Sequence, residues 1–450
     1  MVVSCCGGSL PCHLLKSFYH ITLQKYLAKT FMGFRQRLDE IKSGFTSDFW
    51  IANTLELFER FAFYGSKAIL TVFLVTKVGL VNEAGTLAGL FSGVIFLLPI
   101  VAGVLVDRYG FKKTLIACFT IFTIGYFLIG LAGLSFAQEF VNSIGKKNYT
   151  IIVLMITAVG GSLIKPCIVG TVAQTSKPDA KALGFSIYYT LGNLGGAIGP
   201  MLALKIRADL GIEYVLIMSS ITSFILLIST ILFFNEPAKQ EATTQRTFGQ
   251  VFRDMLLVFG NVRFIGFLVI FSGFWIMFWQ IYYLVPFYST DVLKFDNFEL
   301  LETVDAVCII FLTVPMAALV KSWKPITAMT LGFVFATLSW IIIGTIGTVT
   351  AAAIGIAIFA LGEATQSPRF YEYVSTLAPK NQLGTFMGFA FLPVAIGSFA
   401  AGPVADWLRT SYLTTNPSLM WFIVAGIGAV STLLMILYNV FVAPQNPQQT

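Results

Sequence analysis

Residues 50–76 read WIANTLELFERFAFYGSKAILTVFLVT, a stretch long and apolar enough to cross a bilayer as a helix. It nevertheless carries Glu56, Glu59, Arg60 and Lys67 in its middle. At about 100° per residue, these charges and Tyr64 share one helical stripe. Ionisable groups at membrane depth are costly, so we expect the stripe to face protein or a water-filled cavity. The alternative is a satisfied ion pair that only fixes helix packing.

The rest of the 450-residue chain has a similar character. Hydrophobic residues make up 56% and charged residues 11%, against about 25% charged residues in soluble domains. The composition therefore predicts an all-α integral membrane protein with about 12 transmembrane helices. The stretches that are long and apolar enough cover residues 50–76, 85–106, 113–135, 150–173, 184–205, 213–234, 262–288, 300–320, 325–346, 350–371, 383–405 and 419–442.

The longest polar interruption, residues 235–261, divides these stretches into six plus six. Such a layout is typical of transporters built from two six-helix halves with a site at their interface. Lys and Arg concentrate in the segments that face the cytoplasm if both termini are cytoplasmic. We therefore predict a cytoplasmic leader at 1–47, a first six-helix bundle at 48–234, a cytoplasmic linker at 235–261, a second bundle at 262–442 and a cytoplasmic tail at 443–450.

The net charge of +7 does not indicate a nucleic-acid partner, because the cations sit in short loops and form no basic face or tail. The chain has two His, and the spacing of its six Cys suggests no metal site. No nucleophile, metal-binding or phosphate-binding motif is found. We therefore expect no enzyme activity, no metal and no organic cofactor.

A buried layer of charge is predicted where both halves meet. Lys165 lies within GGSLIKPCIVG, residues 160–170. At ~1.5 Å per residue, it is ~12 Å from the inner end of its helix and Glu59 is ~14 Å from the inner end of its own. Glu363 lies at a similar depth, so Glu56, Glu59, Arg60, Lys165 and Glu363 form one layer. Protonation of Glu56 or Glu59 would free Arg60 or Lys165 to bind another anion.

Three further features bear on function. The loop VDRYGFKK, residues 106–113, pairs an acidic residue with a basic cluster that could latch the inner face of the protein. Asp305 is predicted nearer the outer surface, and Trp275 either lines a cavity or faces lipid. The candidate gating residues of the loop are Asp107, Arg108, Lys112 and Lys113.

The first-span segment ELFERFAFYG, residues 56–65, resembles the ExxERFxYYG signature of the proton-coupled oligopeptide transporters, a family within the major facilitator superfamily. The loop at 106–113 resembles the gating loop of that superfamily. FSIYYTLGNLGG, residues 185–196, resembles the fifth-helix signature of the family, and LGEATQSP, residues 361–368, its tenth-helix region. The resemblance covers about residues 48–442 and implies the major facilitator fold.

The resemblance also implies roles for individual residues. Glu363 would receive a substrate amino group and Trp275 would line the pocket. Asn193 and Tyr64 would hydrogen-bond the substrate backbone. The implied proton-coupling cluster consists of Glu56, Glu59, Arg60 and Lys165.

Several pocket positions depart from the family pattern. Phe96 replaces a Tyr of the second helix, and Lys67 stands where the family usually has Arg. Trp279 replaces the usual acidic partner of that residue on the seventh helix. Ala390 replaces a cavity Trp, and Asp305 falls near a position that is usually Asn. We therefore expect Lys67, Phe96, Trp279 and Asp305 to belong to a rebuilt substrate pocket.

The sequence thus predicts a proton-coupled secondary transporter of small zwitterionic or anionic solutes, with di- and tripeptides as the family default, working by alternating access. The proton is the expected coupling ion. The expected partners are a small-molecule substrate and the lipid bilayer, and the protein is expected to be a monomer in a plasma or inner membrane. The alternatives are a major facilitator exporter of hydrophobic or organic-anion compounds, or a transport-dead sensor on the same fold.

Overall fold

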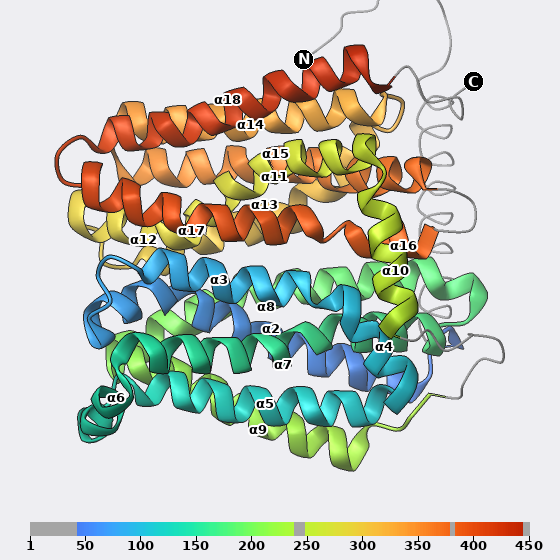
Figure 1. Ribbon diagram of the computed structural model, residues 1–450, viewed down its shortest axis with the longest axis horizontal. Helices are drawn as coiled ribbons and strands as arrows, with labels where there is room; N and C mark the ends of the chain where they lie inside the picture. The colour runs from blue at the N-terminus through green and yellow to red at the C-terminus, as the bar shows by residue number, and fades with distance from the viewer. Residues whose placement is uncertain (1–42, 238–247, 379–382, 444–450) are drawn as a thin grey trace, which may run out of the picture.

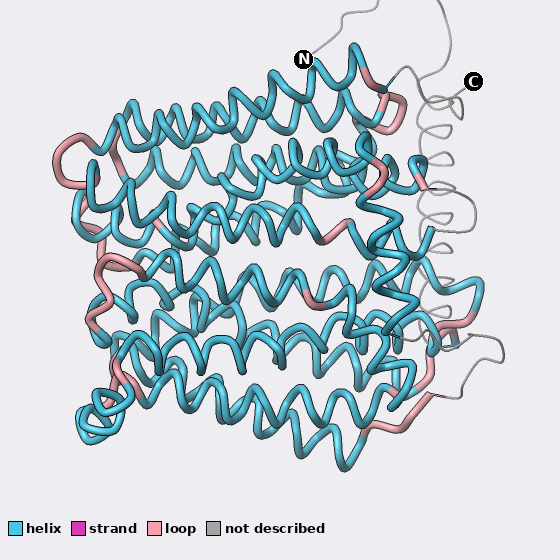
Figure 2. The backbone as a smooth tube through the Cα atoms, viewed as in Figure 1, coloured by secondary structure: helices cyan, strands magenta, loops and turns pink. Residues whose placement is uncertain are grey.

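The computed structural model describes residues 43–237, 248–378 and 383–443 (Figure 1). Most of the predicted leader and tail, and part of the predicted linker, lie outside the described residues. So do the two chain ends, and their cytoplasmic location stays a prediction. In the described ranges the chain is almost entirely helical and contains no strand (Figure 2).

The first half of the chain forms the helices α2 Ser47–Phe73, α3 Ala84–Leu97, α4 Pro99–Tyr109, α5 Phe111–Leu131, α6 Gln138–Ile144, α7 Lys146–Thr175, α8 Lys181–Asp209 and α9 Ile212–Phe233. A π-helical turn, η1 Leu74–Val78, continues α2. The short 3₁₀ turns η2 Ser135–Ala137 and η3 Pro178–Ala180 precede α6 and α8.

The second half forms α10 Phe248–Phe259, α11 Val262–Tyr283, α12 Val285–Phe287, α13 Phe298–Leu319, α14 Pro325–Ile346, α15 Val349–Leu377, α16 Leu383–Phe389, α17 Leu392–Tyr412 and α18 Pro417–Phe441. A π-helical turn, η4 Tyr288–Val292, extends α12. α10 lies within the segment predicted as a linker, so part of that linker is helical.

Ten helices in the described ranges are long and apolar enough to span a membrane, and α3 with α4 forms an eleventh span that bends by 48°. Pro99 begins α4, and a proline at this point accounts for the bend. The remaining predicted span corresponds to α8, which has 29 residues and packs against α2 and α13. Its many glycine and polar residues lower its hydropathy. The all-α, multi-pass membrane architecture is confirmed, and the count of twelve stays a prediction.

The helices form two bundles that lie side by side, α2–α9 in one and α11–α18 in the other (Figure 1). At the end of the molecule where α12 lies, which we call the α12 end, α3 packs along α17 and α8 packs along α13. At the opposite end, the α10 end, α4 meets α10 and α16 of the other half.

The α3–α17 contact closes the α12 end tightly. A Cβ added to Gly89 would lie 2.6 Å from the carbonyl oxygen of Ser398, and one added to Gly402 would lie 2.4 Å from that of Gly85. Asp406 of α17 accepts hydrogen bonds from the backbone N–H groups at the start of α3, at 2.8 and 2.7 Å. Small residues therefore let the two backbones touch, as is usual where membrane helices cross closely.

Candidate functional site

Glycines of α8 bring the charged stripe of α2 against the neighbouring helix. A Cβ on Gly195 would lie 2.3 Å from Cβ of Arg60, and one on Gly199 would lie 2.9 Å from the carbonyl oxygen of Phe61. Because the helices approach this closely, the stripe faces protein and not lipid, as predicted. Glu56 and Glu59 are 0% and 1% exposed, and Arg60 is 5% exposed.

The four predicted proton-coupling residues lie together. Arg60 Nε lies 2.5 Å from Glu59 Oε2 and 3.4 Å from Glu56 Oε1. Lys165 Nζ, from α7, lies 3.3 Å from the same Glu56 oxygen and donates a hydrogen bond of 2.9 Å to Tyr188 Oη of α8. Two cations thus share one carboxylate oxygen, and cations at this distance favour the charged form of a carboxylate.

A cavity of about 220 Å³ lies beside this cluster, between the two halves. Arg60 and Lys165 line it, whereas Glu56 and Glu59 do not. The cations therefore face the cavity with the carboxylates behind them. An anionic group that entered the cavity could compete with Glu56 and Glu59 for these cations.

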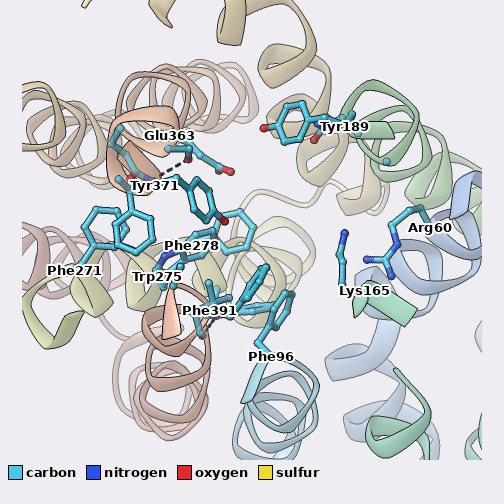
Figure 3. A pocket seen from close by; sticks show the side chains of 18 of the residues that line it. Arg60, Phe96, Lys165, Tyr189, Phe271, Trp275, Phe278, Glu363, Tyr371 and Phe391 are labelled. Atoms are coloured by element: carbon cyan, nitrogen blue, oxygen red, sulfur yellow. Dashed lines mark hydrogen bonds between the residues drawn. The ribbon is translucent and has the colours of Figure 1, made fainter. Parts of the chain in front are cut away.

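The second half supplies the opposite wall of the cavity. Glu363 of α15 lines it and has one buried oxygen, Oε2, without a hydrogen-bond partner. Figure 3 shows Glu363, Tyr371 and Trp275 on one side and Arg60 and Lys165 on the other. No hydrogen bond or ion pair crosses between Glu363 and the cluster in the described part of the chain. The predicted layer of charge is therefore assembled from both halves around an open space.

Lys67 points into a ring of aromatic side chains. Its Nζ lies 3.7 Å from the centre of the Tyr282 ring, 3.9 Å from that of Trp279, and 5.3 Å from those of Phe278 and Tyr64. The side chain is buried. Trp279 thus holds Lys67 through a cation–π contact, where the resembled family has an ion pair.

The remaining predicted pocket residues divide into two groups. Phe96, Asn193, Trp275 and Trp279 line the cavity, and so do Tyr64 and Lys67. Asn193 donates to the Tyr189 carbonyl of its own helix at 2.9 Å, which leaves its amide oxygen for a ligand. Asp305 does not line the cavity; it is 6% exposed on α13. Its place in the substrate pocket stays a prediction.

The predicted gating loop lies at the α10 end. Asp107, Arg108 and Lys113 are exposed, and no ion pair of the described residues joins the loop to another helix. Glu236, which follows α9, instead accepts hydrogen bonds from the first two N–H groups of α5, at 2.8 and 2.7 Å. A carboxylate at a helix N-terminus is favourable. The latching role of Asp107, Arg108, Lys112 and Lys113 stays a prediction.

Sequence reasoning missed several residues of the cavity. Tyr189 lies four residues before Asn193 and Tyr371 lies eight after Glu363, so helical spacing alone could have placed both in the cavity. Tyr188 was overlooked although it bonds Lys165. Glu302, three residues before Asp305, is a further buried carboxyl group.

The arrangement suits a small zwitterion and reversible proton binding. Two cations line one wall of the cavity, a carboxylate lines the opposite wall, and aromatic rings line the rest of it. In the described ranges, no group of three or more His, Cys, Asp or Glu is placed to hold a metal ion.

Curated relatives include peptide permeases. Residues of this chain are 29% identical over 187 residues to the "Dipeptide and tripeptide permease B" of Aliivibrio fischeri (strain MJ11), covering 39% of this chain and 36% of the relative. The permease of the same name from Photorhabdus asymbiotica is 31% identical over 165 residues, covering 35% and 32%. The chain thus matches about a third of the length of these relatives. "Multidrug resistance protein MdtH" of Photorhabdus laumondii is 22% identical over 337 residues, covering 74% and 80%.

Solved structures of peptide transporters share the fold. A POT family transporter in complex with 5-aminolevulinic acid superposes with a TM-score of 0.72 at 16% identity, covering 87% of this chain and 95% of that one. A peptide transporter POT in complex with sulfate gives 0.72 at 18% identity, covering 87% and 94%. These structural likenesses confirm the predicted fold.

The Major Facilitator Superfamily model matches residues 55–402, which is most of the chain. That match spans the charged stripe of α2, the cavity and most of both helix bundles, and ends before α18. The chain therefore belongs to the Major Facilitator Superfamily.

Proposed function

We propose that the protein is a proton-coupled transporter of di- and tripeptides or similar small zwitterions, and that it works by alternating access. One observation carries this proposal: the ion cluster of Glu56, Glu59, Arg60 and Lys165 presents its two cations to a cavity whose far wall carries Glu363. A zwitterion would place its carboxylate on the cations and its amino group on Glu363.

Coupling follows from the shared ion pairs. A substrate carboxylate that binds Arg60 or Lys165 weakens the hold of that cation on Glu56 or Glu59. The released carboxylate, buried and short of partners, then gains a proton from water. Proton and substrate therefore bind together, and the proton leaves when the cations return to their carboxylates.

The closed α12 end defines the state of the transporter. α3 and α17 touch there through backbone and Asp406, whereas the halves meet at the α10 end through α10 and α16. Movement of the two bundles about the cavity would open one end as it closes the other. The proton is the coupling ion in this scheme, a single chain suffices, and neither an organic cofactor nor enzyme chemistry is needed.

The test is transport by the purified protein in liposomes. With the lumen more alkaline than the bath, labelled dialanine should accumulate above its external concentration, and a protonophore should abolish the accumulation. A matched control is Glu213→Gln, which alters a buried carboxylate paired with Lys77 outside the cavity. Accumulation that ignores the protonophore would rule out proton coupling.

A second candidate is a transporter of hydrophobic compounds. The long match to a multidrug resistance protein and the ring-lined cavity favour it. Ligands stabilise the state to which they bind. A thermal-shift screen that compares dipeptides with lipophilic organic cations distinguishes these two functions. If only the lipophilic compounds stabilise the protein, the result supports this second candidate over peptide transport.

A further inference from the structure

Two buried oxygen atoms in the cavity wall have no hydrogen-bond partner. The described residues include several buried side-chain atoms of this kind, and two of them belong to residues that line the cavity, Glu363 Oε2 and Gln366 Oε1. Both residues lie on α15. The function proposed above uses Glu363 and leaves Gln366 without a role. A buried acceptor without a partner is costly, so its presence in a binding cavity indicates a ligand that donates to it.

The Gln366 side chain is fixed by its surroundings. It is 0% exposed, and its Nε2 donates a hydrogen bond of 3.3 Å to Ser367 Oγ. Its stem packs against α14 at a glycine, because a Cβ added to Gly332 would lie 2.8 Å from Gln366 Cβ and 3.1 Å from Gln366 Cγ. The glycine thus leaves the space that the stem occupies. Since the amide nitrogen is already used, the amide oxygen remains as an acceptor at the cavity wall.

Glu363 and Gln366 lie on the same face of α15. Side chains three residues apart on a helix are neighbours, with Cβ atoms about 5–6 Å apart. One ligand group that lies between the two side chains can therefore contact both oxygens. Arg60 and Lys165 line the opposite side of the cavity, where they would hold a negative group (Figure 3). The α15 face is thus suited to the positive end of the ligand.

From this arrangement we propose that Gln366 is a specificity-determining residue that accepts a second N–H of the substrate ammonium bound by Glu363. The inference rests on the proposed transport of zwitterions and deepens it, because it identifies the class of amine. A primary ammonium has three N–H donors, so one can bind Glu363 and another Gln366. A tertiary ammonium has a single N–H and must leave one of the two oxygens without a partner. The preferred substrates therefore carry an unsubstituted amino group.

Water is the other donor that could satisfy Gln366. A buried water molecule typically makes about three hydrogen bonds, and a cavity of about 220 Å³ has room for water. Water on the Gln366 oxygen would serve the protein without substrate, but it would not distinguish between classes of amine. The two explanations therefore differ in one measurable property, which is the effect of the Gln366 amide on amine selectivity.

The test compares two ligands on the purified full chain by calorimetry, dialanine and its N,N-dimethyl derivative. The wild type should bind dialanine more tightly. Gln366→Met has a side chain of similar length without an acceptor, so it should bind dialanine roughly tenfold more weakly and the dimethyl derivative about as well as before. Gln366→Glu restores an acceptor oxygen and should restore the preference for dialanine.

Gln280 of α11 provides a matched control. It is also 0% exposed and has an unpartnered Oε1, but it does not line the cavity. Gln280→Met should therefore keep the preference of the wild type for dialanine. If Gln366→Met keeps that preference as well, or if the wild type has none, the proposal is overturned and water alone serves the Gln366 oxygen. If Gln366→Met does not fold, Gln366→Asn decides, because it keeps the amide but moves it back by one methylene and should lose the preference.

A second pair of ligands separates this inference from the proposed function. If the wild type binds neither dipeptide, the proposed peptide transport fails, and simple amines then decide the role of Gln366. Thermal-shift measurements would compare n-propylammonium with N,N-dimethylpropylammonium. Stabilisation by the primary amine that Gln366→Met loses and Gln280→Met keeps supports the proposal without peptides. Stabilisation by neither amine, or an equal effect in wild type and Gln366→Met, overturns it.

Discussion

At the scale of single residues, replacement of Glu59 is the most direct test of the proposed mechanism. It bonds Arg60 through Oε2, while its other oxygen is buried without a partner. Glu59→Gln keeps the shape but cannot gain or lose a proton. We expect accumulation driven by a pH gradient to fall to the equilibrium level, while exchange of labelled for unlabelled dipeptide continues. Uptake against a gradient in Glu59→Gln, equal to that of Glu213→Gln, would contradict the role.

Glu363 tests the orientation of the substrate. Its carboxylate faces the cavity opposite Arg60 and Lys165, where a substrate ammonium would find it. Loss of a charged hydrogen bond costs about 1.5–3 kcal/mol, or roughly 10–150-fold in affinity. Glu363→Gln should weaken dipeptide binding by that factor and leave N-acetylated dipeptide nearly unchanged, as measured by calorimetry. Equal loss for both ligands would indicate a general defect of the cavity.

The sequence predicts the polar half of this site better than the aromatic half. Charges inside an apolar stretch are conspicuous, so the stripe on α2, Lys165 and Glu363 could be identified and placed at one depth. Aromatic residues are frequent throughout the sequence, which contains 43 Phe, so an aromatic residue does not by itself indicate a position in the cavity. The cage around Lys67 depends on how α2 and α11 face each other, which no single-helix pattern reveals.

At the scale of elements, the α2–α8 contact positions the charged stripe. A Cβ on Gly199 would meet two backbone atoms, the Phe61 carbonyl oxygen at 2.9 Å and the Gly65 nitrogen at 3.0 Å. Backbone cannot move aside cheaply, so Gly199→Ala should overpack the contact at a cost of about 1–3 kcal/mol. We expect a lower melting temperature in detergent and weaker transport. Gly426→Ala in α18, where a Cβ meets nothing within 4 Å, should melt no lower than the wild type.

The sequence predicts the positions of the spans better than the breaks within them. Runs of apolar residues located the spans because lipid imposes the same requirement on every crossing helix. The bend at Pro99 and the break between α16 and α17 divide runs that read as continuous in the sequence. The helix α10 escaped prediction because its segment is too short and polar to span a bilayer and was assigned to a linker.

At the scale of the whole molecule, the two bundles follow from the six-plus-six pattern, but the end that is closed does not. A transporter that alternates between two states has the same sequence in both, so the sequence does not determine which end is closed in a given structure. The contact of α3 with α17 and the pairing of Arg207 with Glu299 identify the state described here as closed at the α12 end. This closure is reversible only if the contacts between halves can separate while the contacts within each half persist.

That requirement gives a prediction for two cross-links. Thr86 Oγ1 and Asp406 Oδ2 lie 2.7 Å apart across the halves, whereas Ser66 Oγ and Ser219 Oγ lie 2.7 Å apart within the first half. In a background without native cysteines, oxidation of the Thr86→Cys/Asp406→Cys pair should stop dialanine transport, because the α12 end cannot open, and a reductant should restore it. Oxidation of Ser66→Cys/Ser219→Cys should leave transport intact, since α2 and α9 move together in a rigid bundle. Transport that survives the first cross-link, with disulfide formation verified by mass spectrometry, would show that the α12 end does not open during the cycle.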